Sequence, residues 1–172
     1  IVMSPTTRIN PPTRTGFQVA LNGAQVTNTH ASAEEIGWIV IEDGLDFEYD
    51  GVQIETGRDT LVLGHDNGCY ASTYNTINSA SAFAVFSQME VDGADGSWAV
   101  ICSLSATSAG FHSEEDQQFD SERAHTSETM GYIAFSDTLS VDGTALSADW
   151  VEIELQNSYL SPVVVVTGYE AS

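Results

Sequence analysis

Histidine and glutamate recur a few residues before two apolar segments of this chain. An imidazole close to a carboxylate can bind a cation or a polar ligand, and an aromatic ring beside them can pack against that ligand. The pattern therefore predicts a ligand-binding role for six residues. They are His30, Glu34 and Trp38 in the first segment and His125, Glu128 and Tyr132 in the second.

A structural role explains the same pattern. His125 can donate a hydrogen bond to a backbone carbonyl or a carboxylate, and so hold the loop that leads into the following strand. Gly131 would then allow close backbone approach where that strand starts. We favour this interpretation, because the first copy keeps its histidine and glutamate without the acidic cluster that accompanies the second.

The acidic run SEEDQQFDSE at 113–122 is a candidate metal site. Ca²⁺ takes about six to eight oxygen ligands, and this run supplies many carboxylates. The candidate ligands are Glu114, Glu115, Asp116, Asp120 and Glu122. The run lacks the ligand spacing of an EF-hand, and a solvated acidic face is the simpler interpretation. Calcium is thus a candidate cofactor and no other is indicated.

The cysteines and the catalytic motifs give little chemistry. Cys69 and Cys102 form no CxxC pair, so the sequence allows either one disulfide or two buried thiols. The chain has no GxSxG, HExxH, phosphate-binding-loop or dinucleotide-binding motif. We therefore expect a protein that is not an enzyme.

The charge balance limits the partners. Four Lys and Arg oppose 25 Asp and Glu, for a net charge of −21. Nucleic acids and anionic membrane surfaces are poor partners for such a chain, because both attract basic residues. No apolar run approaches the roughly 20 residues that span a bilayer, so no membrane insertion is expected. Dispersed acidity fits a halophilic or marine setting, where salt screens the repulsion.

Short apolar runs separated by turn residues dominate the sequence and predict an all-β, antiparallel β-sandwich. Asp-Gly pairs, such as Asp50-Gly51, mark tight turns between the runs. No stretch keeps a helical period over three turns. The expected strands are 16–21, 37–43, 59–64, 69–75, 82–91, 97–104, 131–136, 150–155 and 161–169.

An internal repeat of about 90 residues divides the chain. Gly16-Phe17 and Gly37-Trp38-Ile39 match Gly110-Phe111 and Gly131-Tyr132-Ile133 at a separation of 94 residues, and the run at 69–75 is aligned with 161–169. We expect the second half of a sandwich at 1–48, a complete one at 49–138 and the first half of a further one at 139–172. Half-sandwiches leave strand edges open, so these halves must pair within the chain or with a neighbouring subunit.

The middle copy carries a family resemblance. The pattern GF…EED…DSERAHTSETMGYIAF at 110–135 resembles a repeat of large secreted and surface proteins of mainly marine bacteria, and SPVVVVTGYEAS at 161–172 is similar to the opening strands of H-type lectin domains. The resemblance implies an H-type lectin-like β-sandwich, often trimeric, that binds carbohydrate and serves cell adhesion. The Trp-His pair that grips sugar in those lectins has no counterpart, since none of the three tryptophans adjoins a histidine.

Three functions remain open at this point. The first is a non-enzymatic extracellular module for adhesion or carbohydrate binding within a larger surface or secreted assembly, with glycans or cell-surface polysaccharide as partners. The second is a structural subunit of an extracellular filament or viral appendage, which self-associates by strand complementation between half-repeats. The third is an accessory domain of a polysaccharide-degrading enzyme.

Overall fold

Strands make up almost all of the regular structure. The computed structural model describes residues 16–17, 36–90, 92, 97–115, 117, 121–138 and 162–168. The elements are β1 (Ile36–Glu42), β2 (Asp46–Tyr49), β3 (Val52–Val62), the 3-10 helix η1 (His65–Asn67), β4 (Tyr70–Thr73), β5 (Phe83–Gln88), β6 (Ser97–Ser105), β7 (Ser108–Glu115), β8 (Glu128–Phe135) and β9 (Pro162–Gly168). All named strand pairs are antiparallel, so the predicted all-β sandwich class is confirmed.

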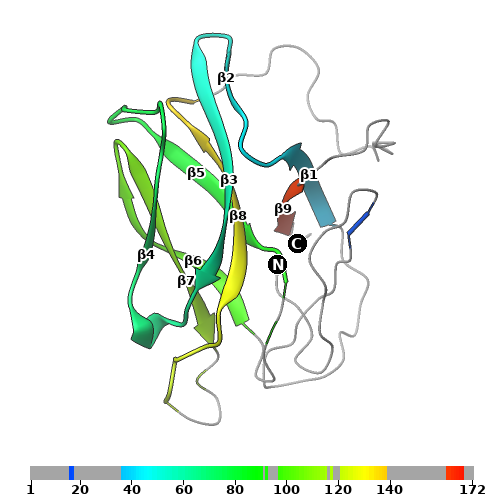
Figure 1. The fold of residues 1–172 in the computed structure, drawn as a ribbon, viewed down its shortest axis with the longest axis vertical. Helices are drawn as coiled ribbons and strands as arrows, with labels where there is room; N and C mark the ends of the chain where they lie inside the picture. Colours follow the sequence, from blue (N-terminus) through cyan, green and yellow to red (C-terminus); the bar gives the residue numbers. More distant parts are fainter. Residues whose placement is uncertain are drawn as a thin grey trace, which may run out of the picture.

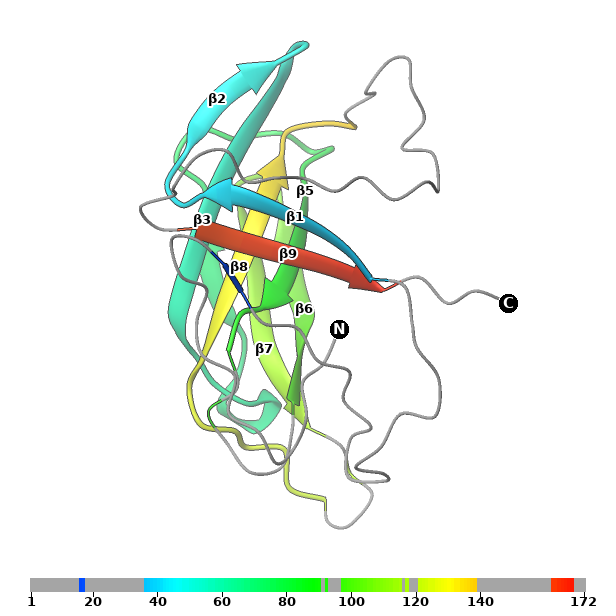
Figure 2. The ribbon, with the colours of Figure 1, turned by 90° about the vertical axis from the view of Figure 1, so that its right-hand side faces the viewer.

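The strands form three layers. The middle sheet has the order β2-β3-β8-β5, and the sheet β4-β7-β6 covers one of its faces (Figure 1). The pair β1-β9 lies across the other face, where β9 contacts β3, β5 and β8 (Figure 2). This pair joins a strand from residues 1–48 to one from residues 139–172 within the same chain.

Strand β8 is buried on both faces. Met130, Tyr132 and Ala134 belong to the core cluster that also contains Phe111 of β7. Ile133 points the other way, into a second cluster with residues of β3 and partly buried Ile41 of β1. Because successive residues of a strand face opposite sides, a strand covered twice has no polar face. This explains the unbroken apolar run of the sequence there.

The turn between β2 and β3 follows from its sequence. Asp50 and Gly51 both have positive φ, 50° and 78°, as the two-residue Asp-Gly hairpin turn requires. Tyr49 and Val52 on either side are cross-strand partners. The boundary expected between residues 48 and 49 therefore falls inside β2.

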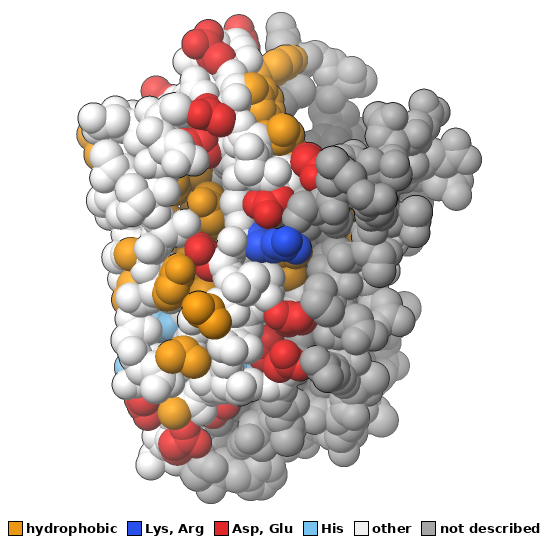
Figure 3. Space-filling view, in the orientation of Figure 1, with side chains coloured by type: hydrophobic (Ala, Val, Ile, Leu, Met, Phe, Trp, Pro, Cys, Tyr) orange, Lys and Arg blue, Asp and Glu red, His pale blue; other side chains and the backbone are white. Residues whose placement is uncertain are grey.

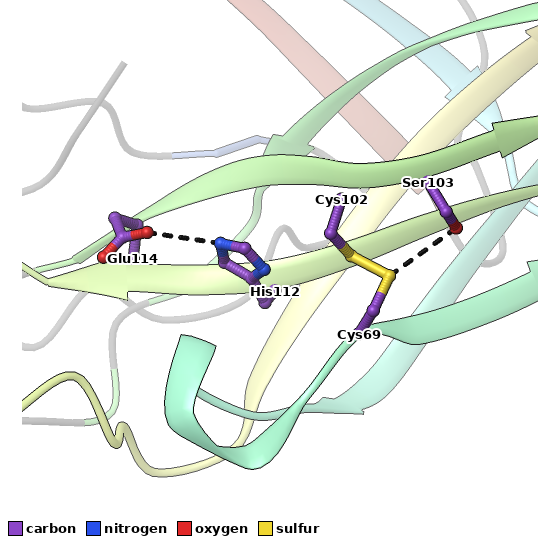
Figure 4. Close-up of a disulfide and its surroundings, with 5 residues drawn as sticks. All are labelled: Cys69, Cys102, Ser103, His112 and Glu114. Carbon is purple, nitrogen blue, oxygen red and sulfur yellow. Dashed lines mark hydrogen bonds and ion pairs between the residues drawn. A yellow bond between two sulfur atoms is a disulfide. The ribbon is translucent and has the colours of Figure 1, made fainter.

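A disulfide ties two strands across a third. Cys69 precedes β4 and is bonded to Cys102 of β6, with Cα atoms 5.9 Å apart. Strand β7 lies between β4 and β6, and the β6–β7 register shifts where Cys102 lies, between Ile101 and Ser103. Of the two states that the sequence left open for the cysteines, the structure has the disulfide (Figure 4). Closing a loop of this length stabilises the fold by about 3 to 4 kcal/mol.

Gly110 of β7 makes room for this crossing. A Cβ atom at Gly110 would lie 2.5 Å from Sγ of Cys69 and 2.3 Å from Oγ of Ser103. Ser103 is also the residue to which the sulfur of Cys69 is hydrogen-bonded in Figure 4. A side chain at position 110 therefore forces the disulfide away from the sheet.

The sequence did not predict β2 (Asp46–Tyr49), and β3 and β7 also differ from the expected strands. Ser108–Glu115 forms β7, although its polar residues gave no strand signal; Ala109, Phe111 and Ser113 are all fully buried on its inner face. Strand β3 begins at Val52 rather than at residue 59, because the hairpin with β2 extends it. The strand expected at 150–155 and most of that at 16–21 lie outside the described residues.

We expect Gly110→Ala to lower the free energy of unfolding by about 2 kcal/mol, because the added methyl overpacks the space under the disulfide. Gly16, which occupies the same position of the repeat, is the matched control: among the described residues, a Cβ there meets nothing within 4 Å. Urea unfolding followed by circular dichroism measures both variants. Equal stability of the two variants would contradict this account of Gly110.

Candidate functional site

His125 lies in the loop that leads into β8 and is buried, with 6% of its surface exposed. Its Nδ1 is 2.9 Å from the carbonyl oxygen of Thr126, to which the ring N–H donates in that tautomer, and 3.4 Å from Oε1 of Glu128. Its Nε2 is buried, has no hydrogen-bond partner among the residues that the structure describes, and lies 3.6 Å from Oε1 of Glu115. The ring thus fastens the loop to its own backbone, which is the contact that the structural interpretation expects.

Glu128 is fully buried at the start of β8. Its Oε1 accepts a hydrogen bond from the backbone N–H of Asp92 at 2.8 Å, and its Oε2 has no hydrogen-bond partner within the described part of the chain. Burial, together with the nearby carboxylates of Glu90 and Asp92, raises the pKa of Glu128 to about 8, against hydrogen bonds that lower it. The carboxyl group is therefore protonated at neutral pH, in the interior of the sandwich.

The aromatic members of the repeated motif are packed side chains. Tyr132 lies over Gly57, where a Cβ would be 2.3 Å from its hydroxyl oxygen, and it accepts a hydrogen bond from Ser72 at 3.0 Å. Trp38 is half-buried, and its ring meets that of Phe17 edge-on at a centroid distance of 5.5 Å. His30 and Glu34 lie outside the described residues. The fold thus brings His125 and Glu128 together and places Tyr132 farther along the same inner face.

The acidic run is divided between an ion pair and buried positions. Glu114 is held by the guanidinium of Arg123, which lowers the pKa of Glu114, and Glu114 also lies 3.3 Å from Nε2 of His112. Glu115 is buried, and Glu122 accepts a hydrogen bond from the backbone N–H of Ala124. Asp116 and Asp120 lie outside the described residues. Within the described part of the chain, no group of three or more His, Cys, Asp or Glu is arranged to hold a metal ion.

A second polar cluster joins η1 to the same loop, and sequence reasoning did not identify it. The carboxylate of Asp66 accepts a hydrogen bond from the backbone N–H of Arg123 at 3.0 Å, which lowers the pKa of Asp66. The rings of His65 and His112 meet perpendicularly at 4.9 Å. Arg123 thus bridges two acids from distant parts of the sequence, Asp66 and Glu114.

Glu55 of β3 is a buried carboxylate that the sequence did not single out. It accepts hydrogen bonds from the backbone N–H groups of Asn75, Thr76 and Ile77 at 2.6, 2.6 and 2.7 Å, and another from the Thr76 hydroxyl. Burial alone would raise the pKa of Glu55, but these donors together lower it below its ordinary value. Glu55 therefore anchors the loop between β4 and β5.

One exposed apolar surface lies along β3 and β4. Leu61, Leu63 and Tyr70 are 64%, 41% and 38% exposed, and we call these three residues the Tyr70 surface. Figure 3 shows hydrophobic side chains gathered over these strands beside acidic ones. The hydroxyl of Tyr70 is hydrogen-bonded to Asp59, whose pKa is raised by burial despite this bond. Among the described aromatic residues, Tyr70 thus combines exposure with a carboxylate partner.

Comparison with known proteins adds no assignment. No protein-family model matches the chain, and no curated protein or solved structure matches it. Among the described residues, no helix is long and apolar enough to cross a membrane.

We expect Glu128→Gln to remove a pH dependence of stability. An acid with a pKa near 4.5 when unfolded and about 8 when folded keeps its proton only in the native state between these values. The free energy of unfolding of the native sequence should therefore fall as pH rises through this window, on the order of 4 kcal/mol in total. Urea unfolding at pH 5 and pH 8.5 should show this loss in the native sequence and in Glu122→Gln, whose site is exposed, but not in Glu128→Gln. An equal loss in all three proteins would contradict a protonated Glu128.

Glu55→Gln should show the opposite behaviour. A carboxylate with a lowered pKa stabilises the fold above its unfolded pKa, and this contribution is lost as pH falls through the folded value. We expect Glu55→Gln to cost about 2 kcal/mol at pH 7, and the cost to shrink in acid. Glu48→Gln on exposed β2 is the control and should be near neutral. A cost for Glu55→Gln that does not change between pH 7 and pH 3 would refute the carboxylate anchor.

Proposed function

We propose that the chain is a non-enzymatic, extracellular β-sandwich module that binds carbohydrate or mediates adhesion within a larger surface or secreted assembly. The observation that carries this proposal is the Tyr70 surface. An exposed aromatic ring offers a flat apolar face on which a sugar can stack. Tyr70 supplies such a ring at one edge of the sandwich, and its hydroxyl is hydrogen-bonded to the partly buried carboxyl group of Asp59.

The disulfide supports an extracellular location. Disulfides persist in oxidising compartments, and Cys69–Cys102 is a cross-link within the folded sandwich. The net charge of −21 supports a surface that stays soluble in salt.

The internal position of the polar clusters supports a non-catalytic role. His125, Glu128 and Glu55 are buried and bonded to nearby loops. A substrate needs access to the groups that act on it, and these groups are covered by the fold. Their arrangement favours a scaffold that presents its outer surface.

A structural subunit is the second candidate, and the β1–β9 pair favours it. These strands come from opposite ends of the chain and match over seven residue pairs, from Ile36↔Gly168 to Glu42↔Pro162. The same pairing between two molecules would join subunits by strand complementation. Electron microscopy of the purified protein distinguishes the candidates: filaments favour the subunit, and uniform monomers exclude it.

We expect Tyr70→Ala to weaken glycan binding about tenfold, because it removes the stacking face, a loss of roughly 1.4 kcal/mol. Tyr49→Ala is the matched control, since Tyr49 is exposed on β2, away from β4. Affinity electrophoresis in gels containing neutral polysaccharides, after a glycan array has selected them, measures both variants. If no glycan retards the native protein, or if both variants lose binding equally, the proposal fails.

A further inference from the structure

Two strand pairs of the molecule have the same register. In the middle sheet, β5 pairs with β8 so that Val85 faces Ile133 and Ser87 faces Gly131. In the outer pair, β9 pairs with β1 so that Val165 faces Ile39 and Thr167 faces Gly37. Gly37 and Ile39 are the repeat counterparts of Gly131 and Ile133, 94 residues earlier. Strand β9 therefore pairs with β1 in the same register as β5 pairs with β8.

The sequences of the two partner strands agree with this register. SAFAVFSQME at 81–90 and SPVVVVTGYE at 161–170 align without a gap at a separation of 80 residues, with serine at one end and glutamate at the other. Val85 and Val165 fall at equivalent positions of this alignment and face the equivalent isoleucines. The segment at 161–169 is thus equivalent to 81–90, and not to 69–75 as the sequence alone predicted.

Aromatic contacts repeat as well. Phe111 of β7 packs on Tyr132 of β8 at a ring-centroid distance of 5.8 Å. Phe17 packs on Trp38 of β1 at 5.5 Å, and both of its residues are 94 positions before the first pair. This contact between sequence-equivalent residues extends the correspondence from the strand pair to Phe17, with the rings stacked in the first unit and edge-on in the other.

We propose that the two ends of the chain together form a second sandwich of the same construction as the first, with β9 in the place of β5 and β1 in the place of β8. The N-terminal segment supplies the positions of β7 and β8, and the C-terminal segment supplies the strand that completes them. The strand that pairs with the edge of β1 is therefore equivalent to β5 and belongs to the same chain.

The sequence intervals that lead to the two partner strands differ in length. Ser81, which precedes β5, lies 31 positions after Asp50, but Ser161, which precedes β9, lies 19 positions after Asp142. In the first unit this interval contains β3, η1 and β4 with Cys69. The shorter interval, and the absence of cysteine outside positions 69 and 102, assign no counterpart of the disulfide to the second unit.

A circular permutant tests whether the ends form one unit. The new chain starts at Leu139, runs to Ser172, continues through a two-residue linker into Ile1 and ends at Thr138. The linker makes the path from Gly168 to Gly16 22 residues long, equal to the path from Gln88 to Gly110. We expect a folded monomer with the native disulfide and an unfolding midpoint equal to or above that of the native order. A permutant that leaves 139–172 or 1–48 sensitive to proteolysis in the folded state overturns the proposal.

Paired cysteines in the full chain test the equivalence without altering the order of the segments. Val40→Cys with Val164→Cys and Ala84→Cys with Ala134→Cys place cysteines at equivalent cross-strand partners of the two units. Val40→Cys with Val165→Cys is the control, displaced by one residue, which puts the two positions on opposite faces of the pair.

We expect both in-register pairs to form an additional intramolecular disulfide in comparable yield, and the displaced pair to form none. Peptide mapping under non-reducing conditions separates these products from Cys69–Cys102. Cross-linking of the first unit without the second, or of the displaced pair as readily as the in-register pair, overturns the proposal even where the permutant fails to fold.

Discussion

The structure depends on covering β8 on both of its faces. Its residues alternate between two apolar clusters, so a single facing sheet would leave Ile133 and its neighbours in water. The sheet β4-β7-β6 covers one face and the β1–β9 pair covers the other (Figure 2). Burying a side chain of this size stabilises the fold by roughly 1.5 to 3 kcal/mol, so both covering layers are needed for the residues on both faces of β8 to contribute. The requirement for a third layer is what brings the two ends of the chain together.

Burial of β8 also explains the chemistry of its polar residues. Glu128 starts the strand and points to the same inner side as Met130 and Tyr132, so it loses water and retains its proton. Glu55 is equally covered but meets three backbone N–H groups, and its pKa moves the other way. The opposite pKa shifts of these two carboxyl groups therefore come from the number of hydrogen-bond donors around each one, and not from a difference in burial. Both serve to fasten loops, and neither is accessible to a ligand from outside.

Exposure separates the buried polar groups of the sandwich from those that a ligand can reach. The His-Glu motif that looked most like a site lies in the interior, whereas the Tyr70 surface, which no motif marked, is exposed. Tyr70 and Tyr132 are the same residue type on neighbouring sheets, yet one lies at the edge of the sandwich and the other within its core. A module of this kind interacts through its edges and outer faces, where strand pairing and aromatic contacts are both possible.

Local sequence determined the features that depend on neighbouring residues. Alternating apolar runs predicted most strands, the Asp-Gly pair at 50–51 predicted the hairpin turn, and the recurrence of Gly-aromatic-Ile at 37–39 and 131–133 predicted two related strands. The tertiary structure alone decided which strand pairs with which and that the cysteines form a disulfide. It alone also revealed β7, whose sequence does not alternate clearly and whose inner residues are buried by other strands. It also decided that Glu55 meets the loop at 75–77, about 20 residues away. These features depend on contacts between residues distant along the chain, and the free energy of such contacts is settled by the packing of whole layers rather than by the periodicity of any one segment.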